Sequence, residues 1–386
     1  MKICIQGGNV VTETGVLNNQ QVLLEEGKIT AIGPPDTYFD QVVDASGCYV
    51  LPGFIDLHVH GGGGADVSDG TKEAIQQVCR FHAAHGTTGM LLTTRTMPKD
   101  EVSDVLRTMA SCIHSPDPQG SLPMGIHLEG PFIHEDYKGA QNADHMIAPD
   151  VSLMEHWMEL SEQSIRLVTL APEKTGADQL IRWLTSRGII ASAGHCGPDY
   201  DTMLKAIEYG VSHITHCFNG MSGFSHRNPG MLAAALMDER VSAELIMDTI
   251  HVHPAAGKLL LYNKGLQNTL LVTDAIRAAG LPDGEYRSAG GRQIYVEDGA
   301  ARLPSGQLAG STLTMNKAVA HAVQHMGVSV QEASIMASLI PARKLGLSDR
   351  KGSIMVGKDA DVVIADSDFN VRMTIRNGRV IYRSIA

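Results

Sequence analysis

The middle of the chain alternates short apolar runs with amphipathic segments. In residues 71–85, 178–187 and 200–209 the apolar positions recur at the spacing of one helix face. Eight apolar runs of strand length end near His58, Thr94, Glu129, Ala171, His195, Cys217, Asp248 and Asp274. Because strands that alternate with helices form parallel sheets, eight such units predict an α/β fold, a (β/α)8 TIM-like barrel. A doubly wound open sheet is the alternative.

Both ends of the chain follow a strand pattern instead. The strand-like segments are residues 1–5, 21–25, 48–51, 361–365 and 379–382. The turn-forming pair Asn377-Gly378 precedes the last of them. We therefore predict a small β-sandwich domain built from both termini, residues 1–50 and 345–386. The barrel, residues 51–344, is inserted between these two parts as the catalytic domain.

Two histidines, His58 and His60, end the first of the eight runs. Side chains two residues apart on a strand point to the same side, so both imidazoles face one point. Such a pair supplies two neutral nitrogen ligands to one metal ion. An ordinary pair of hydrogen-bonded histidines fits the two residues equally well, and only the other strand ends distinguish the two interpretations.

Six of the eight predicted strands end in histidine, glutamate or aspartate. Besides the first pair, these residues are His127 and Glu129, His195, His213 and His216, Asp248 and His251, and Asp274. Each has an ordinary explanation; Asp274, for example, is of a type that often caps a helix. Because a barrel gathers its active site at the carboxyl ends of its strands, their joint occurrence there favours a metal centre.

The residue types indicate which metal and which chemistry. Imidazoles with a carboxylate suit Zn²⁺ or Fe²⁺ rather than Mg²⁺, which prefers oxygen ligands. Glu129 has two oxygens and is able to bridge two metal ions. A metal with one open position lowers the pKa of a bound water and polarises a carbonyl group. Asp274, at the end of the last strand, is the candidate to take the proton of that water and to pass it to a leaving group.

Composition narrows the class of protein and its partners. The chain has 386 residues and a net charge of −11, which argues against a nucleic-acid surface. No apolar run is long enough to cross a bilayer, and the first residues lack the apolar core of a signal peptide. The six scattered cysteines include no Cys-x-x-Cys pair and are typical of reduced thiols. We expect a cytoplasmic enzyme without nucleic-acid or membrane partners.

Seven motifs resemble the amidohydrolase superfamily and, within it, the N-acetylglucosamine-6-phosphate deacetylases. The first three are Pro-Gly-Phe-Ile-Asp-Leu-His-Val-His-Gly at 52–61, His-Leu-Glu-Gly-Pro-Phe at 127–132 and Leu-Ala-Pro-Glu at 170–173. The others are Ser-Ala-Gly-His at 192–195, Thr-His-Cys-Phe-Asn-Gly-Met at 215–221, Val-Thr-Asp-Ala at 272–275 and Leu-Ala-Gly-Ser at 308–311. The resemblance covers nearly the whole chain, including the divided β domain.

The resemblance implies hydrolysis of the acetamide of N-acetylglucosamine 6-phosphate to glucosamine 6-phosphate and acetate. A metal-bound hydroxide is the nucleophile, and Asp274 is the general base and acid. Glu129, His195 and His216 are implied as ligands of the main metal. His58 and His60 are implied to hold a second one, so each subunit carries one or two Zn or Fe ions.

The resemblance also assigns the residues around the substrate. His251 is implied to contact the substrate and to stabilise the oxyanion. Asn219, the Gly220 amide and Arg227 are implied to hold the phosphate, in a homodimer where the arginine can reach the neighbouring subunit's site. The loop at 224–230 suits a phosphate by its residue types, although an ordinary exposed arginine fits the sequence as well.

Three residues depart from the family pattern. Thr249 stands where glycine is usual, Gln141 where some members carry a histidine that touches the sugar, and Arg95 adds a cation near the mouth of the site. Gln141 keeps the ability to hydrogen-bond the sugar. These changes leave open an N-acetylgalactosamine 6-phosphate deacetylase, or one for another N-acyl amine. A cyclic amidohydrolase on the same scaffold and a non-catalytic binder of metal or sugar phosphate are further alternatives.

Overall fold

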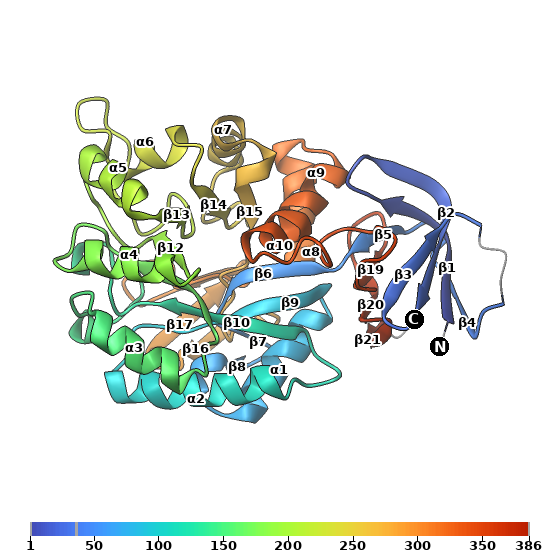
Figure 1. Ribbon diagram of the computed structural model, residues 1–386, viewed down its shortest axis with the longest axis horizontal. Helices are drawn as coiled ribbons and strands as arrows, with labels where there is room; N and C mark the ends of the chain where they lie inside the picture. Colours follow the sequence, from blue (N-terminus) through green and yellow to red (C-terminus); the bar gives the residue numbers. More distant parts are fainter. Residues whose placement is uncertain (1, 35–37, 385–386) are drawn as a thin grey trace.

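The chain folds into a large curled sheet surrounded by helices, with a small β domain at one side (Figure 1). The computed structural model describes residues 2–34 and 38–384. Residues 1, 35–37 and 385–386, which the predicted small domain includes, lie outside the described residues. Both ends of the described chain belong to the small domain (Figure 1).

Eight parallel strands form the large sheet, and each is hydrogen-bonded to the next along the chain. They are β6 (Phe54–Val59), β9 (Thr87–Thr93), β10 (Leu122–Glu129), β11 (Ile165–Leu170), β12 (Ile190–Ala193), β13 (Val211–Ile214), β14 (Ser242–Leu245) and β15 (Thr269–Leu271). All residues of β6 and β9 are buried, as continuous apolar runs predict for strands covered on both faces. The eight predicted strands are confirmed.

The segment after β15 joins the last strand to the first. Val59 and Ala275 form an isolated parallel bridge, and the Asp274 amide donates to the His58 carbonyl oxygen at 2.8 Å. The His60 amide in turn donates to the Ala275 carbonyl at 2.9 Å. The sheet therefore curls until its two edges meet, which confirms the predicted barrel and brings Asp274 beside the two histidines of β6.

Helices cover the outside of the ring (Figure 1). Those between the strands are α1 (Lys72–Ala83), α2 (Lys99–His114), α3 (Val151–Leu160), α4 (Ala177–Ser186), α5 (Tyr200–Tyr209), α6 (Gly230–Met237) and α7 (Pro254–Lys264). α1 shows why they form: the Thr71 hydroxyl caps its first turn, and Ile75, Val78 and Cys79 bury one face. Gly86 follows with φ +88°, and a Cβ there would lie 2.7 Å from the Phe54 ring, so this turn requires glycine.

The last helical segment packs against β6 and β15. It comprises α8 (Met315–His321), α9 (Val330–Ser334) and α10 (Ile340–Lys344), with π-helical stretches at Ala322–Met326 and Ile335–Leu339. None of the described helices is long and apolar enough to cross a membrane.

The small domain is one hydrogen-bonded sheet that branches at its first strand. Its strands are β1 (Lys2–Val11), β2 (Val16–Glu25), β3 (Lys28–Ile32), β4 (Gln41–Asp44), β5 (Tyr49–Pro52), β19 (Val362–Ala365), β20 (Val371–Arg376) and β21 (Arg379–Arg383). β1 pairs with β4 near its start and with β5 near its end, across an irregularity between Ile5 and Val10. The residue boundaries predicted for the two domains stay a prediction.

A three-stranded antiparallel sheet after the last barrel strand was not predicted from the sequence. It consists of β16 (Gly284–Arg287), β17 (Gln293–Glu297) and β18 (Ala300–Arg302). Its own core is small, and Ile294, Val296 and Ala301 are among its few buried residues. Short strands with so few apolar positions leave only a weak pattern in a sequence.

Buried ion pairs hold the segment before β19, where the small sheet meets the barrel. Lys351 Nζ lies 2.6 Å from Asp361 Oδ2 and 3.0 Å from Asp359 Oδ2, and all three side chains are largely buried. The second Asp361 oxygen accepts the Asn377 amide at 2.8 Å, and its backbone oxygen accepts the Gly53 amide. Asp361 therefore ties β19 to the β20–β21 turn and to the start of β6.

Asp361→Ala is expected to lower the free energy of unfolding by about 3 kcal/mol, because it leaves the Lys351 ammonium buried with one carboxylate instead of two. Chemical denaturation with urea measures the change. Asp104→Ala, which removes an exposed partner of Arg107, is the matched control and should leave the transition where it is. Equal effects of the two substitutions would contradict the expectation.

Candidate active site

Six side chains from five strands meet at the carboxyl end of the barrel. They are His58 of β6 and His60 just after it, Glu129 of β10, His195 after β12, His216 after β13 and Asp274 after β15. All are nine-tenths or more buried. These are the five residues predicted as metal ligands together with the predicted acid and base, so the structure brings the whole predicted cluster together.

Glu129, His195 and His216 form the tightest group. Glu129 Oε1 lies 3.1 Å from His195 Nε2 and 3.2 Å from His216 Nε2, and the two nitrogens are 3.1 Å apart. The three atoms thus surround one point, and the three residues are a candidate set for holding a metal ion. Imidazole nitrogen with carboxylate oxygen is a donor set that suits Zn²⁺ or Fe²⁺.

His58, His60 and Asp274 form a second group beside the first. The Nε2 atoms of the two histidines are 3.3 Å apart, and Asp274 Oδ1 lies 3.5 Å and 3.2 Å from them. Glu129 borders this group too, because its Oε2 lies 3.2 Å from His60 Nε2. One carboxylate therefore faces both groups, as a residue that bridges two metal ions would.

Hydrogen bonds fix the orientation of all four imidazoles. The Nδ1 atoms of His195, His216 and His60 contact the carbonyl oxygens of residues 137, 219 and 93, at 2.9, 3.1 and 3.2 Å. His58 Nδ1 lies 2.9 Å from a carboxylate oxygen of Glu244. Because these oxygens only accept, each Nδ1 carries the proton and each neutral ring leaves its Nε2 lone pair directed at the cluster. Lone pairs so close together repel one another without a cation between them, so the residues fit a metal ion.

The carboxylates and imidazoles of the cluster shift one another's pKa values. Burial alone would raise the pKa of Glu129, but the charge of His58 and the hydrogen bonds of His195 and His216 hold that pKa well below its usual range. Burial alone would lower the pKa of His60, yet its bonds to Asp274 and Glu129 raise the pKa to about 10. The carboxylates thus stabilise positive charge at this point, and binding of a metal cation is expected to displace protons.

The backbone at these strand ends is strained. His195, His216 and Asp274 have φ angles of +48°, +29° and +48°, in the left-handed region that side chains other than those of glycine rarely adopt. Each residue lies two or three positions beyond the end of a strand, where the left-handed backbone turns the chain and directs the side chain inward. Strain of this kind persists where surrounding contacts enforce it, and it is common at functional sites.

Glu244 is a functional candidate that the sequence reasoning missed. It is completely buried in β14, and its Oε2 accepts from His58 Nδ1 and from the His216 amide, both at 2.9 Å. Its Oε1 lies 3.2 Å from His213 Nε2. One side chain thus orients a residue of each group. A glutamate inside the apolar run 241–247 was the signal, since a buried strand seldom carries an unpaired carboxylate.

His127 lies next to the cluster without belonging to it. It shares a candidate metal-binding group with His58 and Glu244 by distance. Its Nδ1 is 3.1 Å from the Leu57 carbonyl oxygen, and its Nε2 is 2.7 Å from the Thr169 hydroxyl. Burial lowers the pKa of His127 to about 3. Both nitrogens of a neutral ring are therefore already used, and we assign it to the scaffold.

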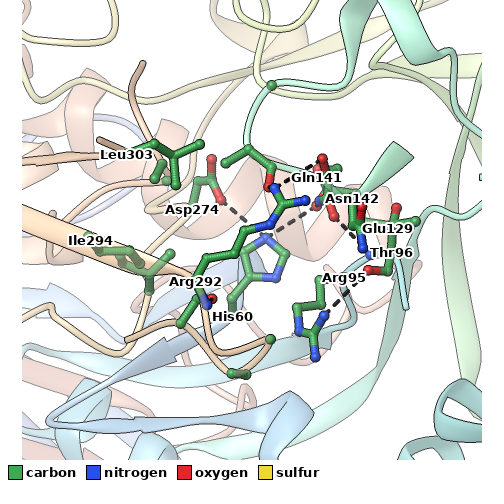
Figure 2. A pocket seen from close by; sticks show the side chains of 18 of the residues that line it. His60, Arg95, Thr96, Glu129, Gln141, Asn142, Asp274, Arg292, Ile294 and Leu303 are labelled. Atoms are coloured by element: carbon green, nitrogen blue, oxygen red, sulfur yellow. Dashed lines mark hydrogen bonds and ion pairs between the residues drawn. The ribbon is translucent and has the colours of Figure 1, made fainter. Parts of the chain in front are cut away.

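A cavity of about 620 Å³ opens above the cluster. His60, Glu129 and Asp274 lie in its floor, and Figure 2 shows their side chains directed toward one another. The three-stranded sheet and the segment after it supply the opposite wall through Arg292, Ile294 and Leu303 (Figure 2). The unpredicted sheet thus forms part of the wall of the site.

The predicted phosphate-binding residues Asn219 and Gly220 line this cavity on the side of His195 and His216. Gly220 has φ +60°, and a Cβ there would lie 2.9 Å from His195 Nδ1, so only glycine brings the backbone this close. Arg227, in contrast, is exposed and does not line the cavity of its own chain.

His251 also lines the cavity, and Asp248 holds it in place. The Asp248 carboxylate accepts from His251 Nδ1 at 2.6 Å and from the His251 amide at 2.7 Å. Burial alone would lower the pKa of His251, but the bond to Asp248 raises it. Thr249 between them has φ +67°, a strained conformation for a β-branched residue. Thr249 thus forms the turn that the family's usual glycine would allow.

The predicted sugar contact Gln141 lies in the cavity wall with both ends of its amide engaged. Its Nε2 donates to Glu129 Oε2 at 2.7 Å, and its Oε1 accepts the Thr96 amide at 2.8 Å (Figure 2). In this arrangement the side chain orients the central carboxylate. A contact with a sugar stays a prediction.

Comparison with known proteins gives a consistent result. The amidohydrolase family model matches residues 49–381. An N-acetylglucosamine-6-phosphate deacetylase of Bacillus subtilis (strain 168) is 38% identical over 380 residues, which cover 97% of this chain and 96% of the relative. An N-acetylgalactosamine-6-phosphate deacetylase of Escherichia coli O157:H7 is 36% identical and covers 97% of this chain and 98% of its own length.

A solved structure agrees in fold over almost the whole length. It is a mutant N-acetyl-D-glucosamine-6-phosphate deacetylase from Mycobacterium smegmatis in complex with N-acetyl-D-glucosamine-6-phosphate. Its TM-score is 0.92 at 32% identity, and the match covers 98% of this chain and 99% of the other. The similarity therefore includes the small β domain as well as the barrel.

Glu244→Gln is expected to weaken metal binding at His58 and His60 by roughly tenfold or more, because the neutral amide no longer stabilises the protonated Nδ1 of His58. Metal content after equilibration against graded chelator concentrations measures the loss, and circular dichroism checks the fold. Glu239→Gln, an exposed glutamate near the same strand, is the control. Unchanged affinity in Glu244→Gln would show that the carboxylate does not act on the metal site.

Proposed function

This chain belongs to the amidohydrolase family and is a metal-dependent amide hydrolase, and from that premise we propose that it removes the acetyl group from N-acetylglucosamine 6-phosphate. The products are glucosamine 6-phosphate and acetate. The observation that carries the proposal is the position of Asp274. Its carboxylate borders the imidazole cluster in the floor of a cavity whose wall also holds Asn219 and Gly220.

Glu129, His195 and His216 would hold the main metal ion, and His58 and His60 a second one. The converging Nε2 lone pairs and the two-sided position of Glu129 support this assignment. Nitrogen-rich donors favour Zn or Fe, at up to two ions per chain. A divalent ion in such a site supplies Lewis acidity, which polarises the acetyl carbonyl and makes water a nucleophile near neutral pH.

Asp274 would move the proton that the reaction requires. Burial alone would raise the pKa of Asp274, but the charge of His58 and the hydrogen bond of His60 lower it. A cation held by these histidines would supply positive charge in the same place and keep the carboxylate ionised. It takes a proton from the attacking water and delivers it to the amide nitrogen as the carbon–nitrogen bond breaks. Water thus supplies the oxygen of acetate and one proton of the amine.

His251 and the Asn219-Gly220 segment would position the substrate. The contact with Asp248 keeps one proton of His251 on Nδ1. When the ring carries a second proton, that proton is on Nε2, and the Nε2–H group would donate to the developing oxyanion or to a sugar hydroxyl. The Gly220 amide and the Asn219 side chain offer donors to a phosphate. Their position beside His195 and His216 orients the sugar to that side of the cavity.

Asp274→Asn is expected to lower kcat by about 10²- to 10⁴-fold and to leave metal binding nearly intact, because the amide keeps the shape and loses the proton acceptor. Acetate release by the metal-loaded protein measures the effect, with metal analysis on the same samples. Asp178→Asn, an exposed aspartate on α4, is the control. Near-normal turnover in Asp274→Asn would overturn the assignment.

N-acetylgalactosamine 6-phosphate is a second candidate substrate. The Escherichia coli relative named for that sugar is 36% identical over nearly the same length. Thr249 and the engaged amide of Gln141 also alter the surface that a sugar meets. Side-by-side kcat/KM values for the two epimers, each with and without the 6-phosphate, decide between them.

We propose that the enzyme works as a homodimer in which Arg227 completes the neighbouring site. The residue is exposed in the loop before α6, outside its own cavity. Apolar side chains are exposed on this loop and on α6 and α7, which pack together: Phe224 63%, Met237 70%, Leu259 51% and Tyr262 88%. Such an apolar surface is typical of a protein–protein interface.

Arg227→Ala is expected to raise KM for the phosphorylated sugar about tenfold or more with a smaller effect on kcat, since the arginine contacts a part of the substrate that does not react. The unphosphorylated sugar should not distinguish the two proteins. If the parent enzyme uses both sugars equally, the phosphate assignment is wrong.

Mixing Arg227→Ala with Asp274→Asn tests the exchange between subunits. In a mixed dimer, one site combines an intact Asp274 with the intact Arg227 of the other chain, so activity at substrate concentrations well below KM should rise above that of either variant alone. No recovery after subunit exchange would mean that Arg227 does not act across a dimer.

The proposed location is the cytoplasm. All six cysteines are free thiols, and five of them are buried. Thiols persist without pairing in a reducing compartment.

A further inference from the structure

Arg95 is a cation in the cavity wall without a partner for its charge. It follows β9, is half-buried and lines the cavity. Its Nε is buried without a hydrogen-bond partner among the described residues, and its Nη1 makes a long contact of 3.4 Å with the Thr96 carbonyl oxygen. Among the described residues, no carboxylate forms an ion pair with it. Burial lowers the pKa of Arg95, which expresses the cost of the uncompensated charge.

A second arginine and the tip of the covering sheet lie close to it. Gly290 lies so near that a Cβ on it would be 3.0 Å from Arg95 Nη1. Two residues on, Arg292 reaches across the cavity and donates to the Ala140 carbonyl oxygen at 2.9 Å (Figure 2). The Arg292 guanidinium therefore ties the covering sheet to the backbone carbonyl oxygen of Ala140. Among the described residues, no carboxylate forms an ion pair with Arg292.

Arg95 lies at the His60 side of the cluster, away from the phosphate-binding residues. His60 Nδ1 contacts the carbonyl oxygen of Thr93, two residues before Arg95, and Thr96 bonds to Gln141 beside Glu129. Gly220 lies instead against His195 and His216. With its sugar phosphate on the Gly220 side, a substrate amide over the cluster would direct its acyl group to the opposite side, where Arg95 lies.

We propose that Arg95, with Arg292, forms a second anion subsite that accepts an acyl group ending in a carboxylate. The enzyme then hydrolyses N-dicarboxylic acyl derivatives of the amino sugar phosphate, such as the N-succinyl compound. Water adds to the acyl carbon, the carbon–nitrogen bond breaks, and the amine takes one proton of the water, which gives succinate and the amino sugar phosphate. This inference rests on the proposed function.

The carboxylates of the protein in this part of the cavity do not fill that role. Asp66 accepts the Ser68 amide at 2.9 Å and caps the short helix Val67–Asp69, whose Asp69 pairs with Arg277. Glu101 is exposed on the first turn of α2. They act on Arg95 through space, without contact, so a bound carboxylate would be its first direct partner.

The test compares kcat/KM of the metal-loaded enzyme for N-succinyl- and N-acetylglucosamine 6-phosphate. The variants are Arg95→Leu and Arg95→Lys, with Arg107→Leu as an exposed control on α2. We expect the parent to cleave both compounds. Arg95→Leu should lower the ratio of succinyl to acetyl kcat/KM about 30-fold or more, because it removes one partner of a buried charge pair. Arg95→Lys should lose less, since it keeps the charge without the planar fork, and it serves if Arg95→Leu does not fold. The control should keep the ratio.

Two results would overturn the subsite. One is a parent that cleaves the acetyl compound and neither cleaves nor binds the succinyl compound. The other is an unchanged ratio in both Arg95 variants. Absence of turnover on either compound would instead count against the proposed function. In that case calorimetric titration of the metal-loaded proteins with both compounds decides: weaker binding of the succinyl compound alone in Arg95→Leu supports the subsite, and equal binding contradicts it.

Discussion

The active end of the barrel is organised around one buried carboxylate. Glu129 lies 3.1–3.4 Å from the Nε2 atoms of His195, His216, His58 and His60. A carboxylate removed from water is costly unless positive charge compensates it, and four lone pairs directed at one place are equally unfavourable without a cation. The carboxylate and the four imidazoles thus both require positive charge, which a metal ion provides. The packing around the cluster keeps these groups together.

The scaffold enforces this arrangement at some cost to itself. The backbone at His195, His216 and Asp274 is left-handed and turns the chain inward after three strands. The bridge between Val59 and Ala275, which closes the barrel, fixes the backbone beside Asp274 in this conformation. Beneath the cluster, Glu244 fixes His58 and the backbone of His216 from a fully buried strand. The cavity above is consequently asymmetric, with the Gly220 backbone on one side of the cluster and on the other the Arg95 guanidinium, which forms no ion pair within the described part of the chain.

Much of this could be predicted from the sequence because strands and barrels follow simple periodicities. Eight apolar runs separated by helical patterns defined the parallel sheet, and residues at the ends of parallel strands must lie at one end of a barrel. His58, His60, Glu129, His195 and Asp274 can therefore be grouped from the sequence alone. The β16–β18 sheet could not, because its short, exposed strands bury too few side chains to leave a periodic signal.

The sequence by itself determined the fold and the kinds of residue that meet at its active end. Only the tertiary structure decided what each side chain does there. Glu244 became a partner of His58, the amide of Gln141 turned to Glu129, and Arg227 was left outside its own cavity. Arg95 lines that cavity with its Nε unbonded among the described residues. The physical reason is that strand periodicity is local, whereas hydrogen bonds and burial depend on neighbours that come together only when distant segments pack.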